Sequence, residues 1–216
     1  MKRPAACALF AALLLLFGLP DARAQAKAGL YVGLDSWRYR PLIGASARLD
    51  ATELVGQEDF PFGIVLNPTL EYRHVWGFDG TLGVTSDQAD WSGSVYQFNG
   101  NVLFKLRDFG PEDTNVAPYA GAGLMLSRIS YSNSVTAFDL DVSDDDSDTT
   151  FGLNLLAGAD IEVSDAFTPF VQTRLTLSPQ TEFELYADND DIPNSTRFST
   201  RDATSLTVTI GALIGF

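Results

Sequence analysis

Ser205-Leu-Thr-Val-Thr-Ile-Gly-Ala-Leu-Ile-Gly-Phe216, the last twelve residues of the 216-residue chain, alternate between two kinds of side chain. Every second position is apolar: Leu206, Val208, Ile210, Ala212, Ile214 and Phe216. The positions between them carry Ser, Thr or Gly, and Leu213 is the one exception. Because successive side chains of a β-strand point to opposite faces, we predict a strand with one apolar and one small or polar face.

The same alternation recurs upstream and predicts seven further strands. Their approximate ranges are 29–38, 64–73, 78–85, 96–107, 118–126, 151–163 and 170–177. The clearest is 96–107, where Tyr96 and Phe98 interleave with Gln97 and Asn99. The polar stretches 40–60, 87–93, 132–149 and 186–203 are predicted to be loops.

Eight strands of about ten residues each fit a membrane-spanning barrel, which needs strands of that length in an even number. Outside the N-terminal region, no stretch approaches the 18 apolar residues of a spanning helix. We therefore predict an all-β fold, an eight-stranded antiparallel up-and-down transmembrane β-barrel. The alternative is a soluble β-sandwich or lipocalin-like barrel with its apolar face inward. The many charges and amides on the other face favour a barrel with a polar interior.

The N-terminus has the pattern of a secretory signal peptide, with Lys2 and Arg3 before an apolar run and Ala22-Arg23-Ala24 as the cleavage site. We expect a signal peptide over 1–24 and a barrel domain over 25–216. Residues 1–24 contain the only cysteine, so the mature chain has no disulfide. They also contain three Lys or Arg and one Asp, so their removal takes the net charge from −14 to −16. Such acidity argues against nucleic acid as a partner.

Three stretches resemble the eight-stranded barrel of the outer-membrane protein A-like superfamily. They are Leu30 to Arg38, Ala117-Pro-Tyr-Ala-Gly-Ala-Gly-Leu124 and the strand that ends at Phe216. The resemblance implies a small, barrel-only protein of the bacterial outer membrane, in contact with its lipids and lipopolysaccharide. It also implies that Ile210, Ile214 and Phe216 belong to a signal for the outer-membrane assembly machinery. The loop lengths, more often long after odd-numbered strands, place both termini in the periplasm.

Charges of both signs fall on the face predicted to line the lumen: Glu71, Arg73, Lys105, Asp160, Glu162 and Arg174. The interior of an eight-stranded barrel is narrow enough to be filled by side chains. Isolated buried ions are costly, so these charges are expected to pair in a hydrated plug that closes the lumen. The alternative is a gated ion path through the same network.

The densest charge run supplies weak candidates for divalent cation binding: Asp139, Asp141, Asp144, Asp145, Asp146 and Asp148. It is not a helical calcium loop, because Asp144 stands where that loop needs glycine and Thr150 where it needs glutamate. A solvated, self-repelling segment is the alternative. No other metal site and no cofactor is expected.

His74, the single histidine, lies in the apolar register near Trp76, which favours an interfacial role over a catalytic one. We therefore expect no enzyme, and by default a monomer. The predicted function is structural, with acidic external loops available to a ligand, a surface or lipopolysaccharide. A narrow gated channel for ions or small solutes is the alternative, and conductance in a planar bilayer separates the two.

Overall fold

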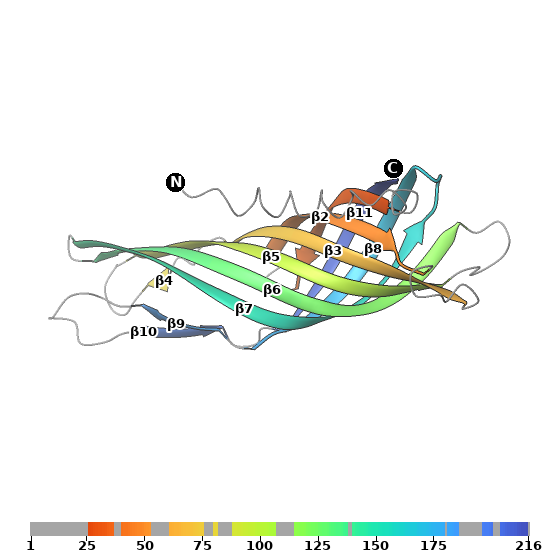
Figure 1. The fold of residues 1–216 in the computed structure, drawn as a ribbon. Coiled ribbons are helices and arrows are strands. Elements are labelled where there is room, and N and C mark those ends of the chain that lie inside the picture. The colour runs from red at the N-terminus through yellow and green to blue at the C-terminus, as the bar shows by residue number, and fades with distance from the viewer. Residues whose placement is uncertain are drawn as a thin grey trace.

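The computed structural model describes residues 26–36, 40–52, 61–75, 80–81, 88–106, 115–137, 140–179, 181–185, 196–200 and 204–215. All regular structure within these ranges is β-strand (Figure 1). Over the same ranges, no helix is long and apolar enough to span a membrane. The predicted signal peptide over 1–24 lies outside the described residues and stays a prediction.

Eight antiparallel strands form the wall of a closed barrel. In barrel order they are β1 (Ala26–Asp35), β2 (Arg40–Asp50), β3 (Phe62–Val75), β5 (Gln88–Leu106), β6 (Val116–Ala137), β7 (Leu140–Ile161), β8 (Phe167–Leu177) and β11 (Ser205–Gly215). The sheet closes into a barrel because its first strand, β1, pairs with β2 on one side and with the last strand, β11, on the other. The two-residue strand β4 (Gly80–Thr81) pairs with β5, while β9 (Thr181–Leu185) and β10 (Thr196–Thr200) form a separate hairpin. The predicted fold class is confirmed.

One of the eight strands was predicted in the wrong place. The structure has a wall strand at Arg40–Asp50, inside the predicted loop 40–60. Conversely, β3 pairs directly with β5, and the described residues of the predicted strand 78–85, Gly80–Thr81, form β4 beside β5 outside this pairing. The sequence 40–50 was misread because Pro41, Gly44 and three alanines or serines weaken its apolar alternation. Pairing on both sides, with β1 and β3, forms the strand despite this weak local signal.

Two other predicted loops are also strands. The range 88–93 belongs to β5, and the described residues of the acidic range 132–149 form the end of β6 and the start of β7. These two strands pair without interruption from Val116↔Ile161 to Ala137↔Leu140. The prediction failed because asparagine, aspartate and serine are depleted in strands, whereas continuous pairing with a neighbour overrides that preference. Within the predicted loop 186–203, Thr196–Thr200 is the strand β10.

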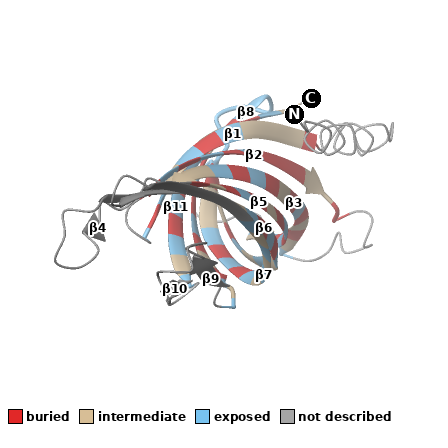
Figure 2. Ribbon diagram, turned by 90° about the vertical axis from the view of Figure 1, so that its left-hand side faces the viewer, coloured by how far each residue is buried: buried red, intermediate tan, exposed pale blue. Residues whose placement is uncertain are grey.

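The wall has an apolar outer face and a mostly polar inner face. Figure 2 shows exposed and buried residues alternating along the strands. In β7, Leu155 is 51% exposed while its neighbour Asn154 is 1% exposed. Apolar side chains such as Leu30, Val32 and Ile210 likewise face outward. The alternative of a soluble barrel with its apolar face inward is therefore wrong, and the exposed apolar belt is suited to lipid.

Both ends of the wall-forming chain lie at one end of the barrel, here called the terminal end. Lys27 of β1 pairs with Gly215 of β11, and Ala26 pairs with Leu49 at the end of β2. The connections 51–61, 107–115 and 162–166 join strands at the terminal end. The connections 36–39, 76–87, 138–139 and 178–204 join them at the opposite end, here called the far end. The charged segment 53–60, predicted to be external, lies outside the described residues, and the strands flanking it end at the terminal end.

Candidate functional site

The lumen gathers the polar and charged side chains that alternation assigns to the inner face. Those buried there include Asp35, Ser46, Arg48, Asn67, Thr69, Glu71, Gln97, Asn99, Asn101, Asn154, Asp160, Arg174 and Thr176. Together with the buried Ser127 on β6 and Thr209 on β11, they come from all eight wall strands. A shift of the register by one residue would turn each of these side chains toward lipid. The register that keeps the apolar residues outside therefore also determines which polar residues line the lumen.

Glu71 and Arg174 form an ion pair that crosses the lumen. Glu71 lies on β3 and Arg174 on β8, which are four strands apart in the barrel order and so face each other. Arg174 Nη1 donates to Glu71 Oε1, and Arg174 Nη2 donates to Oε2 over 2.6 Å. The Tyr31 hydroxyl also donates to Glu71 Oε1, over 2.7 Å. A bidentate ion pair with an added hydrogen bond compensates the free-energy cost of burying both charges.

A neighbouring ion pair lies beside the first, toward the far end. Arg73 Nη1 donates to the Asp35 carboxylate, and Arg73 Nη2 donates to Gln97 Oε1. Gln97 Nε2 donates in turn to Asn99 Oδ1 over 2.8 Å. The ion pairs are thereby joined to the amide side chains in the middle of the lumen.

Asparagine side chains fill the middle layer. Asn154 Nδ2 donates to Asn99 Oδ1 over 2.9 Å and to Asn101 Oδ1 over 3.2 Å. Thr176 Oγ1 donates to Asn154 Oδ1 over 3.0 Å. Asn67 Nδ2 donates to Ser46 Oγ over 2.7 Å and to the Ala47 carbonyl over 2.9 Å. These amides link β2, β3, β5, β7 and β8 across the interior without any net charge.

A second cross-lumen ion pair lies toward the terminal end. Arg48 on β2 donates to Asp160 on β7, again four strands apart. Arg48 Nη2 also donates to the Tyr119 hydroxyl over 2.9 Å, and its guanidinium carbon lies 4.7 Å from the Tyr119 ring centre. Lys105 Nζ lies 3.1 Å from Asp160 Oδ2 and 2.6 Å from Glu162 Oε1. Glu162 is the exposed member, with 47% of its side chain accessible.

Apolar contacts pack around these polar layers. Tyr31, Leu42, Phe170 and Leu213 form one buried cluster, and Val65, Leu103, Tyr119 and Leu156 form another. The Tyr31 ring lies against Gly44, where an added Cβ would be 2.3 Å from a ring carbon. The Tyr119 ring lies against Gly158 in the same way, at 2.6 Å. Two glycines thus leave room for the two tyrosines that hydrogen-bond to the cross-lumen pairs.

All six charges predicted to line the lumen take part in these ion pairs: Glu71, Arg73, Lys105, Asp160, Glu162 and Arg174. Two members of the network were not among the predicted site residues. Asp35 could have been found, since it alternates with Leu34 on the strand predicted at 29–38. Arg48 could not, because the sequence predicts a loop over 40–60.

The remaining predicted site residues are only partly described. Ile210 and Ile214 face outward on β11, 60% and 55% exposed, whereas Phe216 lies outside the described residues. Of the cation candidates, Asp139 and the side chains of Asp141, Asp144, Asp145 and Asp146 lie outside them as well. Asp148 Oδ1 accepts a hydrogen bond from the Thr149 backbone N–H over 2.6 Å. The described residues contain no group of three or more His, Cys, Asp or Glu side chains placed to hold a metal ion.

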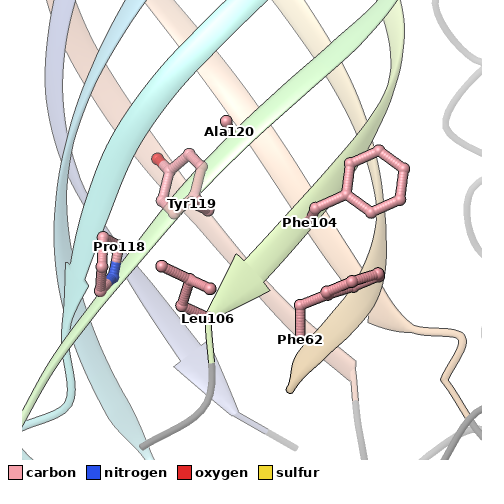
Figure 3. A pocket seen from close by; sticks show the side chains of 6 residues that line it. All are labelled: Phe62, Phe104, Leu106, Pro118, Tyr119 and Ala120. Atoms are coloured by element: carbon pink, nitrogen blue, oxygen red, sulfur yellow. The ribbon is translucent and has the colours of Figure 1, made fainter. Parts of the chain in front are cut away.

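A shallow apolar depression lies on the wall near the terminal end (Figure 3). Its lining residues come from β3, β5 and β6: Phe62, Phe104, Leu106, Pro118, Tyr119 and Ala120. Phe62 and Phe104 meet edge to face, with ring centres 5.6 Å apart. Phe104 and Leu106 belong to the exposed outer face, so this depression is part of the lipid-facing belt.

An eight-stranded barrel with an apolar exterior and an ion-paired interior defines an outer-membrane barrel protein. Residues 9–199 match the family model described as outer membrane protein beta-barrel domain, and the chain belongs to this family. The bacterial outer membrane is therefore its location, and the resemblance to small outer-membrane protein A-like barrels is confirmed. No curated protein matches the chain.

Solved structures similar to the chain are outer-membrane barrels. A major outer membrane protein from Thermus thermophilus has a TM-score of 0.60 at 13% identity, over 88% of this chain and 99% of that one. The attachment invasion locus protein Ail of Yersinia pestis has a TM-score of 0.46 at 12% identity, over 89% and 97%. Neisserial surface protein A has a TM-score of 0.40 at 16% identity, over 88% and 96%. At these identities the Thermus likeness supports the barrel fold alone.

Proposed function

We propose that the protein is a structural, non-conducting component of the outer membrane whose lumen is closed by its own side chains. The observation that carries the proposal is the presence of two ion pairs, Glu71–Arg174 and Arg48–Asp160, that join opposite walls at two levels. An eight-stranded interior is barely wider than its side chains, so a bond across its diameter obstructs the path of a solute. The proposal includes no catalytic activity.

The energetics of buried charge favour a plug that stays shut. The Glu71 and Arg174 side chains are 0% and 1% exposed. Opening the lumen means separating them, and an unpaired buried charge costs several kcal/mol, about 3–5 when one partner is removed. The amide layer between the two pairs adds hydrogen bonds that must break as well. Thermal fluctuation alone therefore opens such a lumen rarely.

The test is the efflux of ions and small solutes from liposomes that contain the refolded barrel. We expect efflux no faster than from empty liposomes, since both cross-lumen pairs persist in the lipid-embedded state. Release of a small solute at a rate proportional to protein content would contradict the plug. A gel shift on heating in detergent is the check that the reconstituted protein is folded.

A narrow gated channel is the second candidate. It is favoured by buried donors that have no hydrogen-bond partner: Arg73 Nε, Arg174 Nε and Thr207 Oγ1. Water or an alternative ion pair can satisfy them, and either provides a route for rearranging the plug. Efflux that begins only above a threshold voltage supports this candidate over the permanently closed barrel.

We further propose that the terminal end faces the periplasm and the far end the outside of the cell. The support is that β5, β6 and β7 extend beyond the wall only at the far end, and outer-membrane barrels carry their larger elements outside. Cysteine labelling of intact cells tests it, since the mature chain contains no cysteine. Thr149→Cys at the far end should react with a membrane-impermeant maleimide, and Asp165→Cys in the terminal-end turn should not. The reverse pattern would invert the orientation.

The same proposal makes the far end the part that contacts lipopolysaccharide, a surface or another ligand. The barrel wall contacts membrane lipid, because its outer face is apolar along every wall strand. Recognition of the terminal strand by the assembly machinery, and a monomeric state, remain proposals. Ile210 and Ile214 support the former, since both face outward where another protein can reach them during insertion.

A further inference from the structure

Two buried side chains toward the far end of the lumen have hydrogen-bond donors that the ion pairs do not use. Thr207 on β11 is 0% exposed, and the Arg174 side chain on β8 is 1% exposed. Arg174 binds Glu71 through Nη1 and Nη2, whereas Arg174 Nε and Thr207 Oγ1 have no hydrogen-bond partner in the described part of the chain. Thr207 and Arg174 are directly opposite each other in the β8–β11 pairing, so their side chains leave neighbouring points of the wall.

Arg73 brings a third donor to the same level of the lumen. Its Nη1 donates to the Asp35 carboxylate, and Asp35 is directly opposite Thr207 in the β1–β11 pairing. Arg73 Nε likewise has no partner among the described residues. The Arg73 side chain is 14% exposed, so this level of the lumen remains in contact with solvent. We call Thr207 Oγ1, Arg174 Nε and Arg73 Nε the donor set.

The chemistry of the donor set favours an acceptor without hydrogens of its own. An arginine Nε–H only donates, and arginine keeps its proton in proteins. The carboxylates at this level already accept hydrogen bonds, Asp35 from Arg73, and Glu71 from Arg174 and Tyr31. A water molecule at the donor set would have two hydrogens to place as well, whereas an anion accepts from every donor and has none to place. Buried donors are costly when they stay unsatisfied, so a bound anion would stabilise the folded barrel.

The charges at this level also favour an anion. The described residues that carry them are Arg40, Arg73, Arg174, Asp35 and Glu71. Three cations therefore stand against two carboxylates, although the whole chain has a net charge of −14. Charges in a buried, low-dielectric setting are screened much less than charges at the surface. The local field is thus opposite in sign to the charge of the protein as a whole.

We infer that the donor set binds one small monovalent anion, such as chloride, inside the lumen. The anion accepts hydrogen bonds from Thr207 Oγ1 and from the Nε atoms of Arg174 and Arg73. It enters from the far end, where the Arg73 side chain is accessible. The inference goes beyond the proposed function, because it requires the ion-paired interior but neither a closed lumen nor a particular orientation in the membrane.

The test is urea unfolding of the full mature barrel in vesicles of zwitterionic lipid. The barrel is unfolded in sodium chloride, sodium bromide and sodium gluconate at the same ionic strength, so that general screening is equal in all three. A ligand that binds only the folded state raises its stability. We expect higher urea midpoints in chloride and bromide than in gluconate, which is too bulky to enter among packed side chains.

Thr207→Val removes the hydroxyl donor and nearly keeps the shape of the side chain. In gluconate it should be at least as stable as the wild type, because a buried unpaired hydroxyl has gone. In chloride it should be less stable than the wild type, because the anion has lost one of its donors. Thr209→Val is the matched control on the same strand and face, since Thr209 is 2% exposed and its Oγ1 already donates to the Gln172 carbonyl over 3.3 Å. It should keep the wild-type difference between chloride and gluconate.

Equal wild-type midpoints in chloride and gluconate overturn the inference. A chloride effect of unchanged size in Thr207→Val also overturns it, because the salt then acts elsewhere on the protein or the lipid. Crystals grown in bromide locate the site, and we expect an anomalous peak beside Thr207 and Arg174. Bromide peaks confined to the outer surface contradict the site. Solute efflux is measured separately, so none of these results decides whether the lumen is closed.

Discussion

Glu71 and Arg174 meet across the centre of the barrel although 103 residues separate them in the sequence. Glu71 is presented by β3 and Arg174 by β8, on opposite walls, and both side chains are almost fully buried. The pair therefore forms only when the barrel has closed with the correct register. It connects the assembly of the fold to the obstruction of its lumen.

Removing one member of this pair should be strongly destabilising. Arg174→Met leaves the Glu71 carboxylate buried without its cation, and we expect a loss of about 3–5 kcal/mol. The double variant Glu71→Leu/Arg174→Met should lose less than Arg174→Met alone, because no buried charge is then left unpaired. Urea unfolding in lipid, followed by the heat-dependent gel shift, measures both.

The exposed pair at the terminal end provides the matched control. Glu162→Gln removes a carboxylate that is 47% exposed, and exposed ion pairs contribute about 0–1 kcal/mol. A loss for Glu162→Gln as large as that for Arg174→Met would show that burial does not determine the strength of these pairs.

Neighbouring leucines on β7 test which face of the wall meets lipid. Leu155 is exposed and Leu156 is buried in the lumen. Leu155→Ala should cost little because lipid replaces the lost contacts, whereas Leu156→Ala should cost about 2–5 kcal/mol by leaving a cavity. Leu155→Arg should cost about 2–4 kcal/mol if position 155 lies near the bilayer midplane. A larger loss for Leu155→Ala than for Leu156→Ala in lipid unfolding would reverse the assignment of faces.

Gly44 tests the packing of Tyr31. A Cβ at Gly44 would lie 2.3 Å from the Tyr31 ring, so Gly44→Val should destabilise the barrel by about 1–3 kcal/mol through overpacking. Gly100→Ala is the control, since a Cβ there meets no atom within 4 Å. The unfolding free energies of the Gly44→Val and Gly100→Ala variants are the measurement. Equal losses of stability for the two variants would mean that the Tyr31 ring can move aside.

Alternation predicted the barrel, its strand number and the six lumen charges because a wall strand must have one face in lipid and one in the lumen. It worked where the outer residues are large, as in 96–107 with Tyr96, Phe98 and Phe104. It failed for Arg40–Asp50, where small residues give a weak contrast between the faces. Arg48 was missed with that strand, and with it the ion pair to Asp160.

The parts of β5, β6 and β7 that extend beyond the barrel wall at the far end were missed for a different reason. Beyond the membrane both faces of a strand meet water, so alternation between apolar and polar residues is no longer required. Ser132, Asn133 and Ser134 on β6 pair with Asp145, Asp144 and Ser143 on β7, a combination that local propensity assigns to a loop. Which residues pair across the lumen also depends on how the barrel closes. A local sequence pattern carries no information about that closure.

The terminal strand should matter more for assembly than for stability. Deleting Phe216 should lower the amount of barrel in the outer membrane while a refolded sample keeps its unfolding free energy, as expected of an assembly signal. Fractionation of cells and unfolding of the purified variant provide the two measurements. Normal outer-membrane levels of the variant would remove the reason to regard Ile210, Ile214 and Phe216 as a signal.

Single-channel recording in a planar bilayer tests the closed lumen most directly. The wild-type barrel, with Glu71–Arg174 and Arg48–Asp160 intact, is predicted to show no steady conductance. The variant Glu71→Ser/Arg174→Ser/Arg48→Ser/Asp160→Ser, once shown to be folded by its heat-dependent gel shift, is predicted to show discrete conductance steps. Steady steps of equal size from the wild type and the variant would contradict the claim that these two pairs close the barrel.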